Sequence, residues 1–315
     1  MSILKKNILL FGDPGIDDTL ALIYALFNPS INLIGIVAGY GNVNRKQTAQ
    51  NAYYLLELAN RKDIPVIGGA IRSVTGEANV YYPEIHGAEG LGPINPPEYI
   101  TDQLLEFCTI FKLIDYYEDV TIVDVGRNSS LATAFTLNED TMKKVKEYYI
   151  MGGAFLVPGN VTPIAEANFH GDPVSTNIVL AQASHVTVVP LNVTNYAIIK
   201  PETIDYLAQN MKPPFGQLIK SIFDFYFQAY QKLIPGIEGT PLHDLFTVWA
   251  IMNPEKVQKV TKQVSVVNDG ISRGLSIADF RAKPEILPDV TFQDIVLKFD
   301  YKFFVDDFIK TMLNR

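Results

Sequence analysis

The chain has 315 residues, of which 48% are hydrophobic and 19% are charged, and its formal net charge is −8. These values are typical of a globular protein, and the absence of a lysine- and arginine-rich stripe argues against nucleic-acid binding. The single cysteine excludes an intrachain disulfide, and no apolar run approaches the roughly 18 residues of a membrane helix. The first apolar run is also too short for a signal-peptide core, so we predict a cytoplasmic protein with no membrane partner.

Short apolar runs alternate with helical patterns through the first two-thirds of the chain. Six runs rich in isoleucine and valine predict buried strands, at residues 7–13, 32–41, 64–70, 120–127, 147–155 and 185–193. The intervening segments place apolar residues three or four apart and predict helices, at residues 17–28, 45–60, 102–118, 129–137 and 172–184. This alternation predicts an α/β fold with an open, mostly parallel sheet and helices on both faces. Cys108 falls within one of these helical patterns and is expected in the core.

The last third of the chain has a different pattern. Residues 214–234 predict a long aromatic-rich helix, and residues 243–253 predict another. A late strand pair is expected within residues 259–270 and 289–300, before a closing helix at 302–314. No linker or repeat separates these elements from the rest. We therefore expect one domain over residues 1–315, with helical and small β additions near the C-terminus.

Three aspartates stand together where the first predicted strand ends. Asp13, Asp17 and Asp18 surround a Pro-Gly turn in the stretch DPGIDD. One interpretation is local, because carboxylates are favoured at the N-terminus of the following helix. However, like charges this close repel one another, and Gly15 allows the backbone to fold the carboxylates together. We therefore favour a shared metal ion.

Other polar residues follow later strands of the predicted sheet. Ligands of open parallel sheets bind beyond the carboxyl ends of the strands, so these residues are candidates for the same site. Carboxylates and amides with hardly a lysine or arginine suit a hard cation and a polyol such as a sugar, and no phosphate-binding motif occurs. The candidates after the second, fourth and fifth strands are Asn42, Asp124, Asn160, Glu166 and Asn168.

Two of the four histidines lie near possible site residues. His243 and Asp244 begin the predicted helix 243–253, where a helix cap is the simplest interpretation. If a metal binds the first aspartates, Asp244 becomes a natural further ligand and His243 a candidate proton donor. His86 lies in a glycine-rich stretch that is equally consistent with a surface loop. The aromatic residues of 224–231, at helical spacing, favour a core role.

Taken together, these motifs resemble a known family. The stretches DPGIDDTLAL, GYGNV, HGAEGLG, MGGAF, GNVTPIAEANFHGDP and HD occur in the order expected of the inosine-uridine-preferring nucleoside hydrolases, over about residues 8–280. The resemblance implies a nucleoside hydrolase-like fold and Ca²⁺-dependent hydrolysis of the N-glycosidic bond of ribonucleosides, giving ribose and free base. It also implies a homotetramer or homodimer.

The resemblance assigns a role to each matching position. The implied calcium ligands are Asp13, Asp18, Asp244 and the backbone carbonyl of Val125. Asp13 would also deprotonate a metal-activated water, and His243 would protonate the leaving base. The implied ribose-binding residues are Asp17, Asn42, Asn160, Glu166 and Asn168. Residues near the base would be His86 and Tyr230, and the two histidines favour a broad or pyrimidine-tolerant enzyme.

Two positions depart from the family pattern. Phe11 stands where the family commonly has the first aspartate of DxDPGxDD, and Asp124 begins DVGRNSS where PTGPLTN is usual. Phe11 argues against a haloacid-dehalogenase-like phosphatase, because that chemistry requires a nucleophilic aspartate at this position. It leaves open a catalytically weak or inactive Ca²⁺-dependent protein that binds a nucleoside or ribose.

Overall fold

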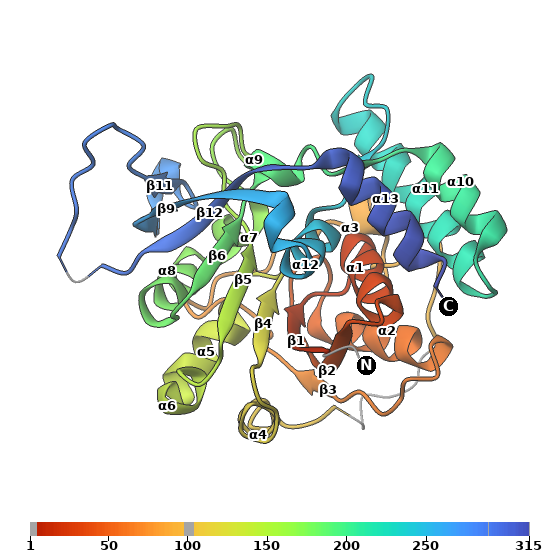
Figure 1. Cartoon of the computed structure of the whole chain (residues 1–315), viewed down its shortest axis with the longest axis horizontal. Helices are drawn as coiled ribbons and strands as arrows, with labels where there is room; N and C mark the ends of the chain where they lie inside the picture. Colours follow the sequence, from red (N-terminus) through yellow and green to blue (C-terminus); the bar gives the residue numbers. More distant parts are fainter. Residues whose placement is uncertain (1–4, 98–103, 289, 315) are drawn as a thin grey trace.

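The centre of the molecule is an eight-stranded sheet (Figure 1). The computed structural model describes residues 5–97, 104–288 and 290–314. In spatial order the strands are β3 (Val66–Gly68), β2 (Ile31–Ala38), β1 (Lys6–Gly12), β4 (Thr121–Asp124), β5 (Glu147–Met151), β6 (Val186–Val189), β12 (Gln293–Phe299) and β9 (Val257–Lys262). Neighbouring strands run parallel except for β9, which is antiparallel to β12. The predicted sheet and the predicted late strand pair are thus confirmed.

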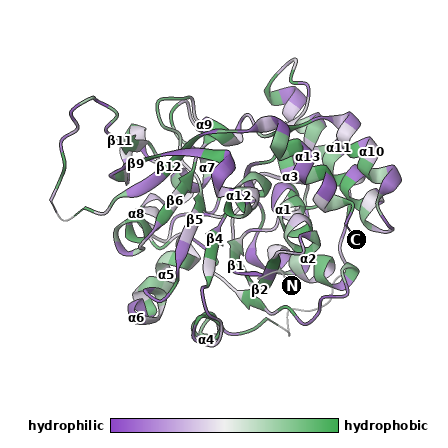
Figure 2. Ribbon diagram, viewed as in Figure 1, coloured by the Kyte–Doolittle hydropathy of each residue, from purple (hydrophilic) through white to green (hydrophobic). Residues whose placement is uncertain are grey.

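Helices cover both faces of this sheet, and a separate hydrophobic core lies on each face. One core contains residues of α1 (Ile16–Phe27), α2 (Arg45–Leu58), α10 (Pro201–Asn210), α11 (Phe215–Leu233), α12 (His243–Met252) and α13 (Tyr301–Met312). The other contains residues of α4 (Thr109–Tyr116), α5 (Ser129–Leu137), α6 (Glu139–Met142) and α8 (Pro173–Gln182). Because successive strand residues point to opposite faces, Leu10 lies in the first core while Leu9 and Phe11 lie in the second. Figure 2 shows hydrophobic residues concentrated in the central strands, with mixed colours on the outer helices α10 and α13.

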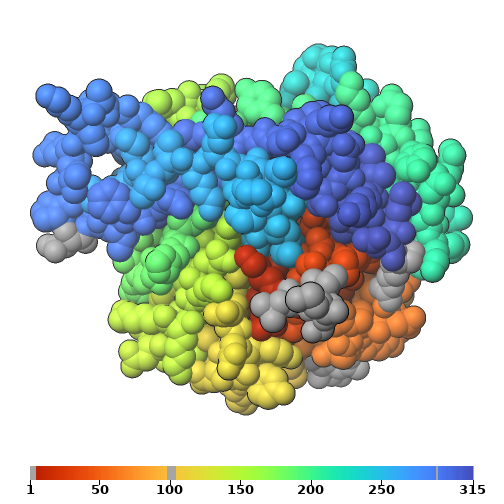
Figure 3. Space-filling view, in the orientation of Figure 1, coloured from red at the N-terminus to blue at the C-terminus, as the bar shows by residue number. Residues whose placement is uncertain are grey.

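Short elements complete the structure. They are α3 (Pro83–His86), α7 (Ala167–Gly171), α9 (Leu191–Thr194), the 3₁₀ turns Pro254–Lys256 and Gly270–Ser272, and the strand pairs β7 (Ile198–Ile199) with β8 (Thr240–Pro241) and β10 (Val264–Val266) with β11 (Ser276–Ala278). The described residues between β11 and β12, 279–288 and 290–292, stand out from the body at the left of Figures 1 and 3. Within the part of the chain that the structure describes, no helix is long and apolar enough to cross a membrane.

Two expectations around residues 102–118 were wrong. The helix begins only at Thr109, because Leu105 instead pairs with Ile67 in an isolated parallel bridge beside β3. Residues 102 and 103 of the predicted helix lie outside the described residues. Cys108, which precedes the helix, is exposed rather than buried in the core.

The parallel strands bring their carboxyl ends to the same edge of the sheet. The register pairs Gly12 of β1 with Ala38 of β2, and Phe11 of β1 with Asp124 of β4. The segments that follow β1, β2, β4 and β5 therefore begin side by side, and the predicted site residues lie in these segments.

Candidate active site

The three clustered aspartates are all buried at the end of β1. The exposed fractions of Asp13, Asp17 and Asp18 are 3%, 7% and 1%. Asp18 lies in the first turn of α1, where its carboxylate accepts hydrogen bonds from the backbone N–H of Gly15 and of Asp13, both at 3.1 Å. The helix-capping interpretation is therefore correct for Asp18, but it accounts for only part of the cluster.

Asp244 brings a fourth carboxylate to this point from the first turn of α12. The charges of Asp17 and Asp18 act on its carboxylate. Carboxylate oxygens of Asp17, Asp18 and Asp244 lie within 4.8 Å of one another, a spacing that could hold a metal ion. Asp13 belongs to the same electrostatic cluster, because its charge acts on Asp244 and is itself acted on by Asp18.

The cluster has too little positive charge around it. Burial, and then the neighbouring Asp17, raise the pKa of Asp18 to about 7. Burial and the adjacent aspartates also hold the pKa of Asp13 and of Asp244 well above the usual range. Asp17 Oδ1 is buried and has no hydrogen-bond partner within the described residues. An all-oxygen donor set with an unpartnered oxygen fits a hard divalent cation such as Ca²⁺.

Asn42 approaches the cluster from the segment after β2. Its backbone N–H donates to Asp13 Oδ2, and its side-chain amide donates to Asp18 Oδ2 at 3.0 Å. The preceding residue is glycine for a steric reason, since a Cβ at Gly41 would lie 2.0 Å from Asp13 Oδ2. Asn42 is therefore held against two of the predicted calcium ligands.

Glu166 and Asn168 lie beyond the end of β5, at the start of α7. Glu166 is buried, and its carboxylate accepts hydrogen bonds from the backbone N–H groups of Gly153, Asn168 and Phe169. Burial raises the pKa of Glu166, against the opposing effect of these donors. The Asn168 amide donates to the Val125 carbonyl at 2.9 Å, so this predicted ligand atom borders the same site.

Asn160 is placed differently from the other predicted ribose residues. It lies in an exposed part of the loop after β5, and its side-chain oxygen accepts a hydrogen bond from the Ala167 N–H at 2.9 Å. Within the described residues it makes no hydrogen bond to another predicted site residue. Its contact instead shapes the loop that carries Glu166.

Two histidines and two tyrosines form the other side of the site. His86 Nδ1 accepts a hydrogen bond from the Ile16 N–H at 3.2 Å and lies 3.8 Å from Asp17 Oδ1. The rings of His86 and Tyr226 have centroids 5.5 Å apart, and those of Tyr226 and Tyr230 are 4.9 Å apart. The Tyr230 hydroxyl lies 3.0 Å from His243 Nε2. The chain of contacts thus joins the two histidines across α11.

His243 is buried and held from both ring nitrogens. Nε2 faces the Tyr230 hydroxyl, and Nδ1 lies 2.8 Å from Thr194 Oγ1 at the end of α9. Burial lowers the pKa of His243 to about 4 and also lowers that of His86. Both imidazoles are therefore neutral near pH 7.

Residues 8–306 match the sequence model of the family of inosine-uridine preferring nucleoside hydrolases. The chain belongs to this family. The family resemblance predicted from the motifs is thus confirmed over nearly the whole chain.

Known nucleoside hydrolases are similar to this chain along almost their full length. The probable uridine nucleosidase 2 of Arabidopsis thaliana is 33% identical over 286 residues, which cover 87% of this chain and 85% of that protein. The pyrimidine-specific ribonucleoside hydrolase RihA of Escherichia coli is 31% identical over 95% of this chain and 96% of its own. Among solved structures, the plant nucleoside hydrolase PpNRh1 superimposes with a TM-score of 0.90 at 29% identity, covering 98% of this chain and 99% of its own.

The candidate site also contains residues that the sequence did not indicate. Tyr226 lies between His86 and Tyr230, although the aromatic helix favoured a core role; its spacing of four residues from Tyr230 was the available signal. Thr194 had no distinguishing motif. Arg127 is a buried cation whose charge acts on Asp13 and Glu166, and its position in DVGRNSS, after a strand end, was its only signal.

The two departures from the family pattern lie side by side. Phe11 is 1% exposed and packs in the second core, and its register partner on the adjacent strand is Asp124. Asp124 is buried and accepts a hydrogen bond from the Gly126 N–H at 3.0 Å. Neither side chain is a member of the buried aspartate cluster.

Proposed function

We propose that this chain hydrolyses the N-glycosidic bond of ribonucleosides to ribose and free base, with Ca²⁺ as cofactor. The observation that carries the proposal is the group of buried carboxylates at the end of β1 and the start of α12, together with the family membership. We assign Asp13, Asp18, Asp244 and the Val125 carbonyl as the calcium ligands. Bound Ca²⁺ would supply a hard positive centre that balances these carboxylates, attracts hydroxyl oxygens and makes water more acidic.

Asp13 is the proposed general base. Its Oδ2 is occupied by the Asn42 N–H, while Oδ1 accepts no hydrogen bond from the described residues. Oδ1 is therefore the atom that would take a proton from the attacking water.

The ribose hydroxyls need both donors and acceptors, and the surrounding residues supply both. The unpartnered Oδ1 of Asp17 is a free acceptor, and the Asn42 and Asn168 amides are donors that now bond Asp18 and the Val125 carbonyl. Glu166 would contribute as an acceptor beside them. Asn160 supports this side of the site through its contact with Ala167.

The histidines and tyrosines on the other side of the site would assist departure of the base. We assign the hydrogen-bonded pair of His243 and Tyr230 as the proton donor to the leaving base, and His86 as a residue that packs near the base. The transition state has oxocarbenium character, as in other glycoside hydrolyses, so stabilising the departing base lowers the barrier. We expect pyrimidine ribonucleosides among the substrates. Relatives that are 31% and 33% identical are named for pyrimidine and uridine hydrolysis, which supports this expectation.

A reducing-sugar assay over a panel of purine and pyrimidine ribonucleosides tests the proposal. We expect ribose release from uridine, its loss with a calcium chelator and its return with added Ca²⁺. The Asp13→Ala variant is the matched control for enzyme-independent release. Ribose release from no nucleoside, with calcium-dependent binding retained, would instead establish a binding protein.

A further inference from the structure

Arg127 is a buried cation at the site that the proposed mechanism does not use. Its side chain is 7% exposed and extends from the segment after β4. Nη2 donates hydrogen bonds to the Gly41 carbonyl at 3.0 Å and to the Val80 carbonyl at 2.6 Å. The guanidinium carbon lies 5.0 Å from the centroid of the Tyr40 ring. One side chain thus joins three separate parts of the chain.

The two carbonyls that Arg127 binds belong to segments that meet at Asn42. Gly41 directly precedes Asn42. Val80 belongs to residues 69–82, which connect β3 to α3 and which we call the 69–82 segment. Tyr82, at the end of this segment, donates its backbone N–H to the Asn42 carbonyl at 3.2 Å. Arg127 therefore links the turn that contains Asn42 to the segment that leads into α3 and His86.

The aliphatic part of the Arg127 side chain packs against α7, the helix at whose start the ribose-binding candidates Glu166 and Asn168 lie. It packs against Gly171 at the end of α7, where a Cβ would lie 2.6 Å from Arg127 Cδ. Glu166 and Asn168 lie at the other end of this short helix. The charge of Arg127 also acts on Glu166 and Asp13, which face it from α7 and from the end of β1.

We propose that Arg127 is a positioning residue that fixes the Asn42 turn and the 69–82 segment around the ribose. This inference rests on the proposed function, because it assigns a role in ribose recognition at the same site. Charge-assisted hydrogen bonds to two carbonyls from one planar group hold both segments in a single arrangement. Removing the guanidinium releases Asn42 and the segment that leads to His86.

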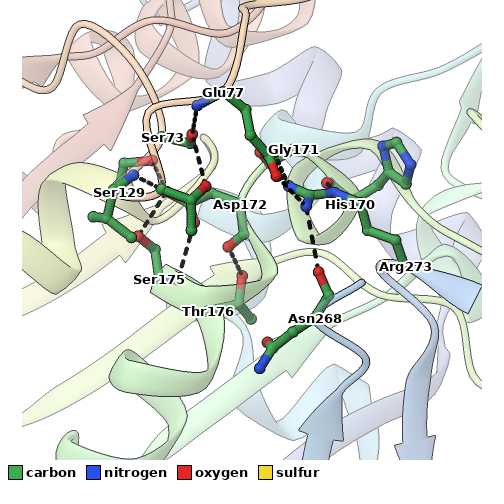
Figure 4. Close-up of polar contacts among 12 residues, drawn as sticks. Ser73, Glu77, Ser129, His170, Gly171, Asp172, Ser175, Thr176, Asn268 and Arg273 are labelled. Atoms are coloured by element: carbon green, nitrogen blue, oxygen red, sulfur yellow. Dashed lines mark hydrogen bonds and ion pairs between the residues drawn. The ribbon is translucent and has the colours of Figure 1, made fainter. Parts of the chain in front are cut away.

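Arg273 provides a matched comparison within the same fold. It also holds the 69–82 segment, through an ion pair with Glu77, and it donates to the His170 carbonyl at 3.0 Å (Figure 4). The other hydrogen bonds of its guanidinium go to the carbonyls of Asn268 and Gly171, not to those of Gly41 and Val80. Arg273 thus anchors the middle of the segment, while Arg127 joins its end to the Asn42 turn.

The experiment compares Arg127→Met with Arg273→Met by steady-state kinetics on uridine, with ribose as a product inhibitor. For Arg127→Met we expect KM and the ribose inhibition constant to rise about tenfold, as for the loss of charge-assisted hydrogen bonds, with kcat changed less than about threefold. Calcium affinity, measured by calorimetry, should stay within about twofold. Arg273→Met should leave KM and ribose inhibition within about twofold of wild type.

Unchanged KM and ribose inhibition in Arg127→Met would overturn the proposal, and so would equal changes in both variants. A parallel loss of calcium affinity would also overturn it. If Arg127→Met does not fold, Arg127→Lys against Arg273→Lys carries the same test, because lysine keeps the charge but not the planar fork. If wild-type protein releases no ribose, the proposed function fails, while calorimetric binding of ribose to wild type and Arg127→Met still decides the role of Arg127.

Discussion

Buried carboxylates occur in two regions of this molecule with opposite surroundings. Asp172, at the start of α8, is fully buried and accepts four hydrogen bonds (Figure 4). Their donors are the backbone N–H groups of Val74 and Ser175 and the hydroxyls of Ser129 and Ser175, at distances from 2.6 to 3.1 Å. This carboxylate is satisfied by its own fold and ties the 69–82 segment to α8.

The carboxylates at the end of β1 are buried to a similar degree but face one another. Carboxylate oxygens of Asp17, Asp18 and Asp244 lie within 4.8 Å of one another, and Asp17 has a buried oxygen without a partner among the described residues. Burying a charge is costly unless donors or an opposite charge compensate it. The donors around each buried carboxylate therefore distinguish a structural acid from a site that needs a ligand.

Replacing Asp13 should have the largest effect on hydrolysis. Asp13→Ala removes both a proposed calcium ligand and the proposed base, so kcat/KM for uridine should fall by more than about 10³-fold. The fold should persist, because the substitution also removes one of several like charges. Steady-state kinetics and circular dichroism measure the two quantities. A variant with wild-type activity would contradict the assignment of this cluster as the catalytic site.

Calcium removal should affect activity and stability together. A chelator should abolish ribose release, and the same treatment should lower the melting temperature because the carboxylates lose their counter-charge. At a free calcium concentration of 100 times Kd, binding stabilises the folded state by about 2.7 kcal/mol. Thermal unfolding across a calcium titration measures the shift, and Asp13→Ala should reduce it. Full activity and an unchanged melting temperature after chelation would contradict a calcium site.

Asp172→Ala should reduce stability more than it affects catalytic chemistry. The substitution leaves several buried donors without an acceptor, which we expect to cost about 3 kcal/mol in the free energy of unfolding. Urea denaturation measures this loss. Asp172→Asn is the control, because it retains one acceptor oxygen and should cost less. An unchanged unfolding free energy would mean that the four hydrogen bonds do not stabilise the fold.

The sequence was sufficient for the sheet and for the position of the aspartates. Strand–helix alternation predicted a mostly parallel sheet, and parallel strands necessarily present their carboxyl ends at one edge. Local patterns failed where distant segments decide the structure. Leu105 pairs with Ile67 and so shortens the helix expected at 102–118, which leaves Cys108 exposed. No periodicity within residues 102–118 carries information about that partner.

The same limit applies to the site. The motifs indicated Asp18 and Asp244, but not that Arg127 binds the Val80 carbonyl, since backbone acceptors have no sequence signature. The departures at Phe11 and Asp124 looked independent in the sequence. The register shows them to be neighbours on adjacent strands.

Among these substitutions, we expect the smallest loss of activity from the histidine–tyrosine side of the site. Tyr230→Phe keeps the ring that packs on Tyr226 but removes the hydroxyl that faces His243 Nε2. Loss of one neutral hydrogen bond in the proposed proton-donor pair should lower kcat by about tenfold while calcium affinity stays the same. Tyr206→Phe, at an exposed position on α10, is the matched control and should match wild type. If Tyr230→Phe is also indistinguishable from wild type, the hydroxyl takes no part in base departure, and the aromatic side of the site would act through packing alone.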